Sequence, residues 1–260
     1  MDTTRSIIRN EYKGIDLTKF ILAILVVAGH THPFIGIKNT TFNQVWEHLL
    51  LLVVPYFFMA AGFFLFSKVY QKSNKQEQLD TIWPYLKRVV TLYIYWTIVF
   101  LPITIWWYFK NDLTFQQDLV LFIRGTFFFG ENYYSWPLWF LLSMIYGIAL
   151  IYLLMLMNLK LKPIFLISIA LFIMANVFNY LVKGESKNSL LLETGRVIKY
   201  LFLSGRLFTG MFYLIVGGLI ALNRIKLSKI ALVGITIAAI SFQFFGLEII
   251  SPLMFGLLPI

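Results

Sequence analysis

The stretch KGIDLTKFILAILVVAGHTHP, residues 13–33, decides the class of fold. Residues 1–14 are mostly polar, and an apolar run follows them. A helix that crosses a bilayer needs about 20 mostly apolar residues, which predicts a membrane span over residues 16–36. The run continues past the core of a signal peptide, and no small-residue cleavage site follows it. This first span is therefore expected to be retained.

The rest of the chain repeats this pattern. Of its 260 residues, 59% are hydrophobic and 13% are charged, whereas soluble domains are about 25% charged. Lipid must cover part of this apolar surplus, which predicts an all-α, polytopic transmembrane helical bundle with about seven or eight spans. Further spans are expected at residues 47–67, 88–109, 136–157, 163–182, 200–221 and 230–250. The apolar stretch 115–130 is too short and interrupted to count, and it favours a re-entrant or interfacial segment.

The basic residues predict an orientation. With the N-terminus inside, 14 of the 22 Lys and Arg fall on the cytoplasmic side. This placement explains the net charge of +10 without nucleic acid as a partner. The basic segment 183–199 falls outside, which indicates either an amphipathic external segment or a miscounted span. We therefore expect a multi-pass protein of a bacterial cytoplasmic membrane, with its N-terminus inside and the bilayer as one partner.

Three ionisable residues mark the first span. Asp16, Lys19 and His30 lie in or beside its apolar run, where charged groups usually face protein or a watery cavity. Lys19 and His30 are eleven residues apart, which places them on one helix face about 16 Å apart along the axis. Asp16 and Lys19 are three apart and can pair. The spacing alone leaves two interpretations open: a functional site, or a snorkelling lysine and a satisfied polar histidine.

His30 is the best candidate for a general base, because imidazole accepts a proton near neutral pH. His32 points about 200° away from it on a helix, and Pro33 follows at once. A His-x-His metal site has no obvious third ligand, and the chain has no cysteine, so no metal site is predicted.

Other candidate binding residues lie further along the chain. Lys87 and Arg88 open the third span, as a topology anchor or as a phosphate site. Arg206 lies inside an apolar run and needs a partner or a cavity, for which Glu131 is a candidate. Trp139, like Trp136, is most simply an interface aromatic at the mouth of the fourth span.

Taken together, four segments resemble the acyltransferase-3 family of bacterial membrane acyltransferases. The segments are Asp16-Leu-Thr-Lys19 with ten residues before His30, Val54-Pro-Tyr-Phe-Phe-Met-Ala-Ala-Gly-Phe-Phe64, Trp136-Pro-Leu-Trp-Phe-Leu-Leu142 and Arg206-Leu-Phe-Thr-Gly-Met-Phe-Tyr-Leu-Ile-Val-Gly-Gly218. Their order and spacing cover about residues 9–222. The family motif of Arg or Lys, ten residues, then His is matched by Lys19 and His30.

The resemblance implies transfer of an acyl group, commonly acetyl from acetyl-CoA, to a glycan or another hydroxyl acceptor of the cell envelope. His30 would be the catalytic base, Lys19 would assist, and Arg88 would help to bind the donor. Asp16, Lys87, Glu131, Trp139 and Arg206 complete the predicted site, with acetyl-CoA as co-substrate and no bound cofactor. A pantetheine arm is long enough to bridge the cytoplasmic charges and His30.

Two departures from the family pattern qualify this expectation. Many members carry a second Arg three residues after the first, where this chain has Thr91. The family usually has about ten spans, so residues 1–260 are expected to form a single domain that is truncated or minimal.

Residues Gly14 to Phe64 also resemble the membrane domain of vancomycin-resistance serine racemases, which makes a serine transporter the alternative. A non-catalytic scaffold is disfavoured, since it has no need of costly charges in the first span.

Overall fold

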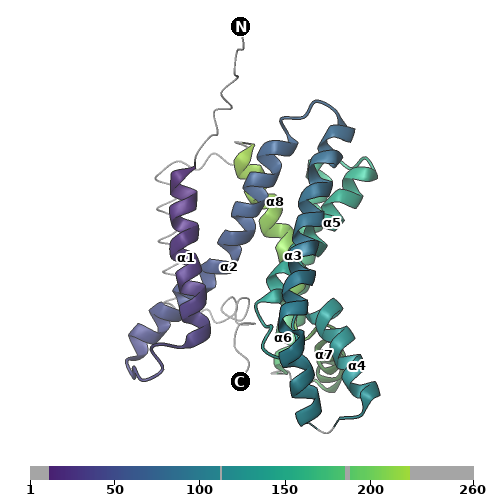
Figure 1. The fold of residues 1–260 in the computed structure, drawn as a ribbon. Helices are drawn as coiled ribbons and strands as arrows, with labels where there is room; N and C mark the ends of the chain where they lie inside the picture. The colour runs from purple at the N-terminus through teal and green to yellow at the C-terminus, as the bar shows by residue number, and fades with distance from the viewer. Residues whose placement is uncertain (1–11, 112, 185–187, 223–260) are drawn as a thin grey trace. The chain divides into compact units, whose positions relative to one another are not determined.

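The structure, a computed structural model, describes residues 12–111, 113–184 and 188–222, and its regular elements there are helices (Figure 1). In chain order they are α1 (Lys13–Thr31), α2 (Thr40–Val69), α3 (Lys75–Lys110), α4 (Phe115–Ile123), the π-helix η1 (Arg124–Phe129), α5 (Leu138–Leu156), α6 (Leu161–Lys183), α7 (Ser189–Phe202), the 3₁₀ helix η2 (Arg206–Phe208) and α8 (Gly210–Ala221). The chain divides into two compact units, residues 1–57 and 58–260, with the boundary inside α2.

The all-helical membrane class is confirmed, whereas the number of spans is not. Among the described residues, α1, α2, α3, α5 and α6 are each long and apolar enough to cross a membrane. The predicted span 200–221 is interrupted, because α7 and the η2–α8 segment form a pair bent by 65°. This pair is a sixth span at most, and the predicted span 230–250 lies outside the described residues.

Local signals in the sequence explain where two of the helices begin. At the start of α3, the side chain of Asn74 accepts a hydrogen bond from the Glu77 amide at 2.8 Å. At the start of α4, Thr114 and Gln117 form a reciprocal capping box. Each cap satisfies amides that the first helical turn leaves unpaired. The stretch 115–130, which is not predicted to span, becomes α4 followed by η1.

Glycines bring α2 and α8 into close contact within the second unit. A Cβ atom on Gly62 would overlap the backbone of Leu214, and one on Gly217 would overlap the backbone of Met59. Small residues let helices approach closely in a membrane, where dispersion between well-packed surfaces drives their association. Leu214 is fully buried at this crossing.

This crossing makes Gly217→Val a sensitive test of the fold. We expect it to lower the free energy of unfolding by about 1–3 kcal/mol, because the added atoms meet backbone that cannot move aside easily. Gly36→Val is the matched control, since a Cβ there meets nothing within 4 Å. Thermal unfolding of the purified variants in detergent measures both. Equal melting temperatures for the two variants would contradict this packing.

Candidate active site

The α1 helix carries the first group of predicted residues. It runs without a break from Lys13 to Thr31, so the predicted spacing of Lys19 and His30 on one helix is confirmed. Asp16 and Lys19 form the expected ion pair, with 2.7 Å between the carboxylate Oδ1 and Nζ. The Lys19 side chain is 34% exposed. Lys19 thus has an ion-pair partner, Asp16, about one turn earlier on α1.

His30 lies in the last turn of α1, and the helix ends one residue later. His32 is the C-terminal cap, with a left-handed φ of 46°, so it leaves the helix on which His30 lies. A Cβ atom on Gly29 would lie 3.0 Å from the Leu50 side chain, and the Tyr56 hydroxyl donates to the Ile15 carbonyl at 3.3 Å. Within the described residues α1 buries none of its side chains, so His30 stays accessible in the first unit.

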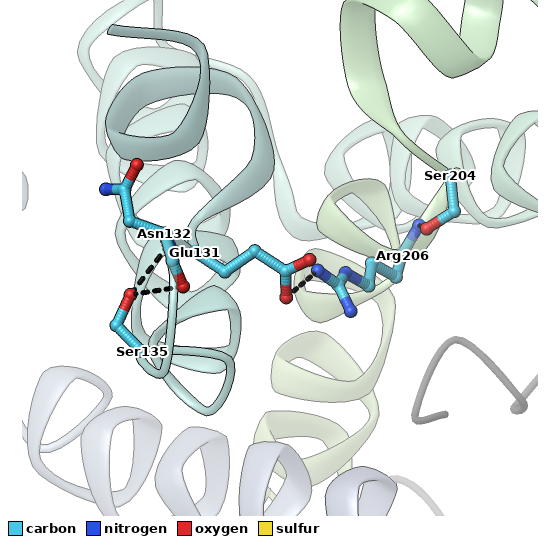
Figure 2. A network of polar contacts seen from close by, with 5 residues as sticks. All are labelled: Glu131, Asn132, Ser135, Ser204 and Arg206. Carbon is cyan, nitrogen blue, oxygen red and sulfur yellow. Dashed lines mark hydrogen bonds and ion pairs between the residues drawn. The ribbon is translucent and has the colours of Figure 1, made fainter. Parts of the chain in front are cut away.

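The second unit contains a buried ion pair between Glu131 and Arg206 (Figure 2). Their side chains are only 15% and 11% exposed. The guanidinium carbon of Arg206 also lies 5.0 Å from the centre of the Trp139 ring, and Trp139 is buried. The predicted partnership of Glu131 with Arg206 is confirmed. The interpretation of Trp139 as an interface aromatic is wrong, because its ring packs against Arg206 inside the unit.

Glu131 follows the π-helix η1 after one residue, Gly130, and the end of η1 fixes its backbone. Gly130 adopts a left-handed φ of 73°, and the Glu131 amide donates to the Gly125 carbonyl at 2.9 Å. A glycine is favoured there because other residues are strained at positive φ. The chain therefore turns sharply at the point where the carboxylate is presented.

Two tyrosines from other helices hold the π-helix. The Tyr93 hydroxyl of α3 donates to the Thr126 carbonyl at 2.5 Å, and the Tyr146 hydroxyl of α5 donates to the Phe127 carbonyl. A π-helix leaves backbone groups out of the usual helical pattern, and such segments are frequent at functional sites. Both hydroxyls thus pair carbonyls of η1, and the bond from Tyr93 is buried.

The loop after Glu131 is closed by its own hydrogen bonds (Figure 2). The Asn132 amide donates to the Ser135 hydroxyl oxygen at 2.7 Å, and the Asn132 side-chain amide donates to Thr126 Oγ1 at 3.1 Å. Ser135 is fully buried. The loop is thus anchored both to itself and to η1, which fixes the direction from which Glu131 approaches Arg206.

Arg206 follows a second irregular segment, the break between α7 and α8. Leu203 has a φ of 59°, and the Arg206 amide donates to the Ser204 hydroxyl oxygen at 3.4 Å. The end of α7 is held by Arg124 of η1, whose Nη2 donates to the Tyr200 carbonyl and whose guanidinium lies 3.9 Å from the Tyr200 ring centre. A cation at a helix C-terminus is favourable for the helix dipole. Two breaks in helical structure therefore meet at one ion pair.

Sequence reasoning missed the residues that support this pair. Tyr93, Tyr146, Arg124 and Asn179 contact the two breaks but were not predicted to belong to the site. One signal was available: each is a polar or charged group within or beside an apolar run, where such groups need partners.

The electrostatics of the pair follow from its burial. Burial raises the pKa of the Glu131 carboxyl above its usual value, and the neighbouring guanidinium of Arg206 opposes that rise. Arg206 remains positively charged, since guanidinium has a very high intrinsic pKa. The pair therefore holds two opposite charges in contact with each other away from water, where hydrogen bonds between charged groups are strong.

Lys87 and Arg88 lie in a different part of the second unit. Both are exposed on α3, and the Lys87 ammonium lies 5.3 Å from the centre of the Trp83 ring. Thr104, further along α3, donates to the Tyr133 carbonyl in the loop of Glu131 at 3.4 Å. Thr104 comes sixteen positions after Arg88 on this helix, or about 24 Å along the axis. The structure thus does not bring these two cations to the Glu131–Arg206 pair.

No group of three or more His, Cys, Asp or Glu side chains that could hold a metal ion occurs within the described part of the chain. The predicted site residues are divided between the two units of the chain. One contains Asp16, Lys19 and His30 on α1, and the other contains the Glu131–Arg206 pair with Trp139, with Lys87 and Arg88 at a distance along α3.

Comparison with known proteins identifies relatives. Two amino-acid racemases of Enterococcus faecalis are 33% and 25% identical over 145 and 131 residues, 55% and 49% of this chain. A serine/alanine racemase of Enterococcus gallinarum is 23% identical over 161 residues, 62% of the chain. These alignments cover 18%, 18% and 22% of the three relatives, so the chain spans less than a quarter of their length. No solved structure matches.

A family profile covers nearly the whole sequence. The profile of the acyltransferase-3 family, described as an acyltransferase domain, matches residues 12–258. This range contains the α1 residues and the Glu131–Arg206 pair alike. The chain therefore belongs to the acyltransferase-3 family.

Proposed function

We propose that the chain is a membrane O-acyltransferase that moves an acetyl group from acetyl-CoA to a hydroxyl group of a cell-envelope glycan. The observation that carries this proposal is the pair Lys19 and His30, eleven residues apart on one unbroken helix, in a chain that belongs to the acyltransferase-3 family. Family membership supports an acyl transfer, whereas the donor, the acetyl group and the glycan are the proposed details.

His30 is proposed as the general base. Its imidazole takes the proton of the acceptor hydroxyl while the hydroxyl oxygen attacks the carbonyl carbon of the thioester. The carbon–sulfur bond then breaks, and the CoA thiolate leaves and is protonated. Lys19, oriented by Asp16 at 2.7 Å, supplies a positive charge about 16 Å from His30 along α1, which favours the approach of an anionic donor.

The donor phosphates are proposed to bind at Lys87 and Arg88. Both side chains are exposed, and they lie on the side of the membrane that the positive-inside pattern assigns to the cytoplasm, where CoA is found. Arg matches phosphate oxygens with its forked N–H groups, and Lys adds a point charge. The Glu131–Arg206 pair is proposed to bind a polar part of the donor or acceptor deeper in the protein.

The double variant Lys87→Ala/Arg88→Ala tests donor binding. We expect its KM for acetyl-CoA to rise at least about tenfold, since hydrogen bonds to charged groups contribute roughly 1.5–3 kcal/mol. The KM for acetyl-pantetheine, which lacks the nucleotide phosphates, should not change. Lys160→Ala/Lys162→Ala is the control, because these lysines are also exposed and are predicted on the same side. An equal rise in KM for both donors would contradict phosphate binding at α3.

The acceptor class is tested in cells. Mass spectrometry should detect acetyl groups on the envelope glycans of cells that contain the protein and not on those of cells without it. Each acetyl group adds the mass of an acetyl in place of a hydroxyl hydrogen. Identical glycans in the two samples, together with no use of acetyl-CoA by the purified protein, would remove the proposed function.

Amino-acid transport is the second candidate, and the racemase relatives favour it. Those relatives are named as racemases of amino acids. Each alignment covers only about a fifth of the relative, so the shared part is a domain of a larger protein. Under this alternative, vesicles containing the protein would take up serine saturably without consuming acetyl-CoA.

A further inference from the structure

Asn179 is a polar residue inside the apolar helix α6, and it contacts the break that precedes Arg206. Its side-chain carbonyl oxygen accepts a hydrogen bond from the Gly205 amide at 3.0 Å. Asn176, one turn earlier on the same helix, instead donates to the Phe172 carbonyl of its own helix at 2.6 Å. The two asparagines therefore differ in role, because only Asn179 reaches another segment through a hydrogen bond of this kind.

Gly205 also lies against α6 at close range. A Cβ atom at this position would overlap the backbone of Ala175, one turn before Asn179. Ala175 is fully buried. The backbone at Gly205 thus packs on α6 through a close contact at Ala175 and a hydrogen bond at Asn179. An interrupted helix at membrane depth needs such partners for the backbone groups that it frees.

The contacts of Gly205 with α6 fix the backbone direction of Arg206, the next residue. Leu203 has a left-handed φ of 59°, α7 and the following segment differ in direction by 65°, and Arg206 begins η2. With the Gly205 amide held by Asn179, the backbone direction at Arg206 is set, and its guanidinium reaches Glu131 and the Trp139 ring. A small rotation of this backbone would move the guanidinium by several ångströms.

We propose that Asn179 is a positioning residue for Arg206: by accepting the Gly205 N–H it fixes the helix break and holds the guanidinium against Glu131 and Trp139. The part of this inference that concerns catalysis rests on the proposed acyl transfer. The part that concerns the ion pair does not depend on it.

A double-mutant cycle tests the link without any assay of activity. Asn179→Leu removes the acceptor at similar volume, and Glu131→Gln weakens the ion pair. Because residues in one network are coupled, we expect the double variant to melt near the temperature of the less stable single variant. The matched cycle with Asn176→Leu should be additive, since Asn176 bonds within its own helix. Additive shifts in both cycles would overturn the proposal.

Two further variants guard against misfolding. Asn179→Asp keeps an oxygen acceptor for the Gly205 amide and should restore most of the melting temperature that Asn179→Leu loses. If Asn179→Leu does not fold, Asn179→Ser takes its place in the cycle, because its hydroxyl is too short to span the same gap. A melting temperature for Asn179→Asp no higher than that of the variant without an acceptor would also overturn the proposal.

Kinetics separate positioning from a purely structural role. With acetyl-CoA, Asn179→Leu should lower kcat at least about tenfold, about 1.4 kcal/mol in the barrier, and Asn179→Asp should recover most of it. Asn176→Leu should leave kcat unchanged. If the unmodified protein transfers no acyl group, the proposed function fails while the stability cycle still decides the positioning role. If it does, and Asn179→Leu retains full kcat with an additive cycle, the positioning role fails alone.

Discussion

Replacing His30 by alanine is expected to reduce acyl transfer from acetyl-CoA by about 10²–10⁴-fold, the usual contribution of a positioned general base. Under the proposed mechanism the acceptor hydroxyl must lose its proton as it attacks the thioester, and His30 takes that proton. No other histidine lies on α1 at the spacing from Lys19 that the family motif requires. Release of free CoA thiol in the presence of acceptor measures the rate. The loss should appear in kcat, since His30 acts on the reacting proton.

The other two histidines supply the controls for this variant. His32 caps the end of α1 in a left-handed conformation, and the Nδ1 atom of His48 lies 2.5 Å from the Gln44 carbonyl oxygen of its own helix. His32→Ala and His48→Ala should therefore keep turnover close to that of the unmodified protein. Full turnover in His30→Ala, or an equal loss in all three variants, would exclude His30 as the base.

The sequence predicted the two ion pairs of the site, because placing a charged side chain among apolar groups costs free energy unless it has a partner. Arg206 lies in an apolar run and Glu131 lies between two others, so each required a partner, and they meet. The pairing of Asp16 with Lys19 followed from their separation by three residues on a helix. In both cases residue type and spacing carried enough information, because the energetic penalty leaves few alternatives.

The breaks in the helices could not be predicted in the same way. Hydropathy over residues 200–221 is continuous, but the backbone bends between α7 and α8 because Gly205 packs against Ala175 and bonds to Asn179. These contacts join residues about 26 to 30 positions apart, which an average over a window cannot detect. The contact of Trp139 with Arg206 involves the same segment, because Arg206 directly follows the bend.

The buried ion pair gives the largest expected effect on stability. Arg206→Ala should lower the free energy of unfolding by about 3–5 kcal/mol, because it leaves the Glu131 carboxylate buried without its partner. It also removes the guanidinium from the Trp139 ring. Unfolding in detergent, followed by circular dichroism, measures the change. Arg196→Ala is the matched control: Arg196 pairs with Glu193 three residues away, but both side chains are more than 60% exposed, so a change of less than about 1 kcal/mol is expected.

The double variant Glu131→Leu/Arg206→Met distinguishes the two contributions that the single variant combines. Removing both charges eliminates the unpaired buried group as well as the attraction, so this variant should be more stable than Arg206→Ala. Acyl transfer should nevertheless stay low, because the fixed charge and N–H groups are gone. A double variant with both stability and full transfer would show that the pair only supports the fold. A double variant less stable than Arg206→Ala would show instead that the attraction outweighs the cost of burying the two charges.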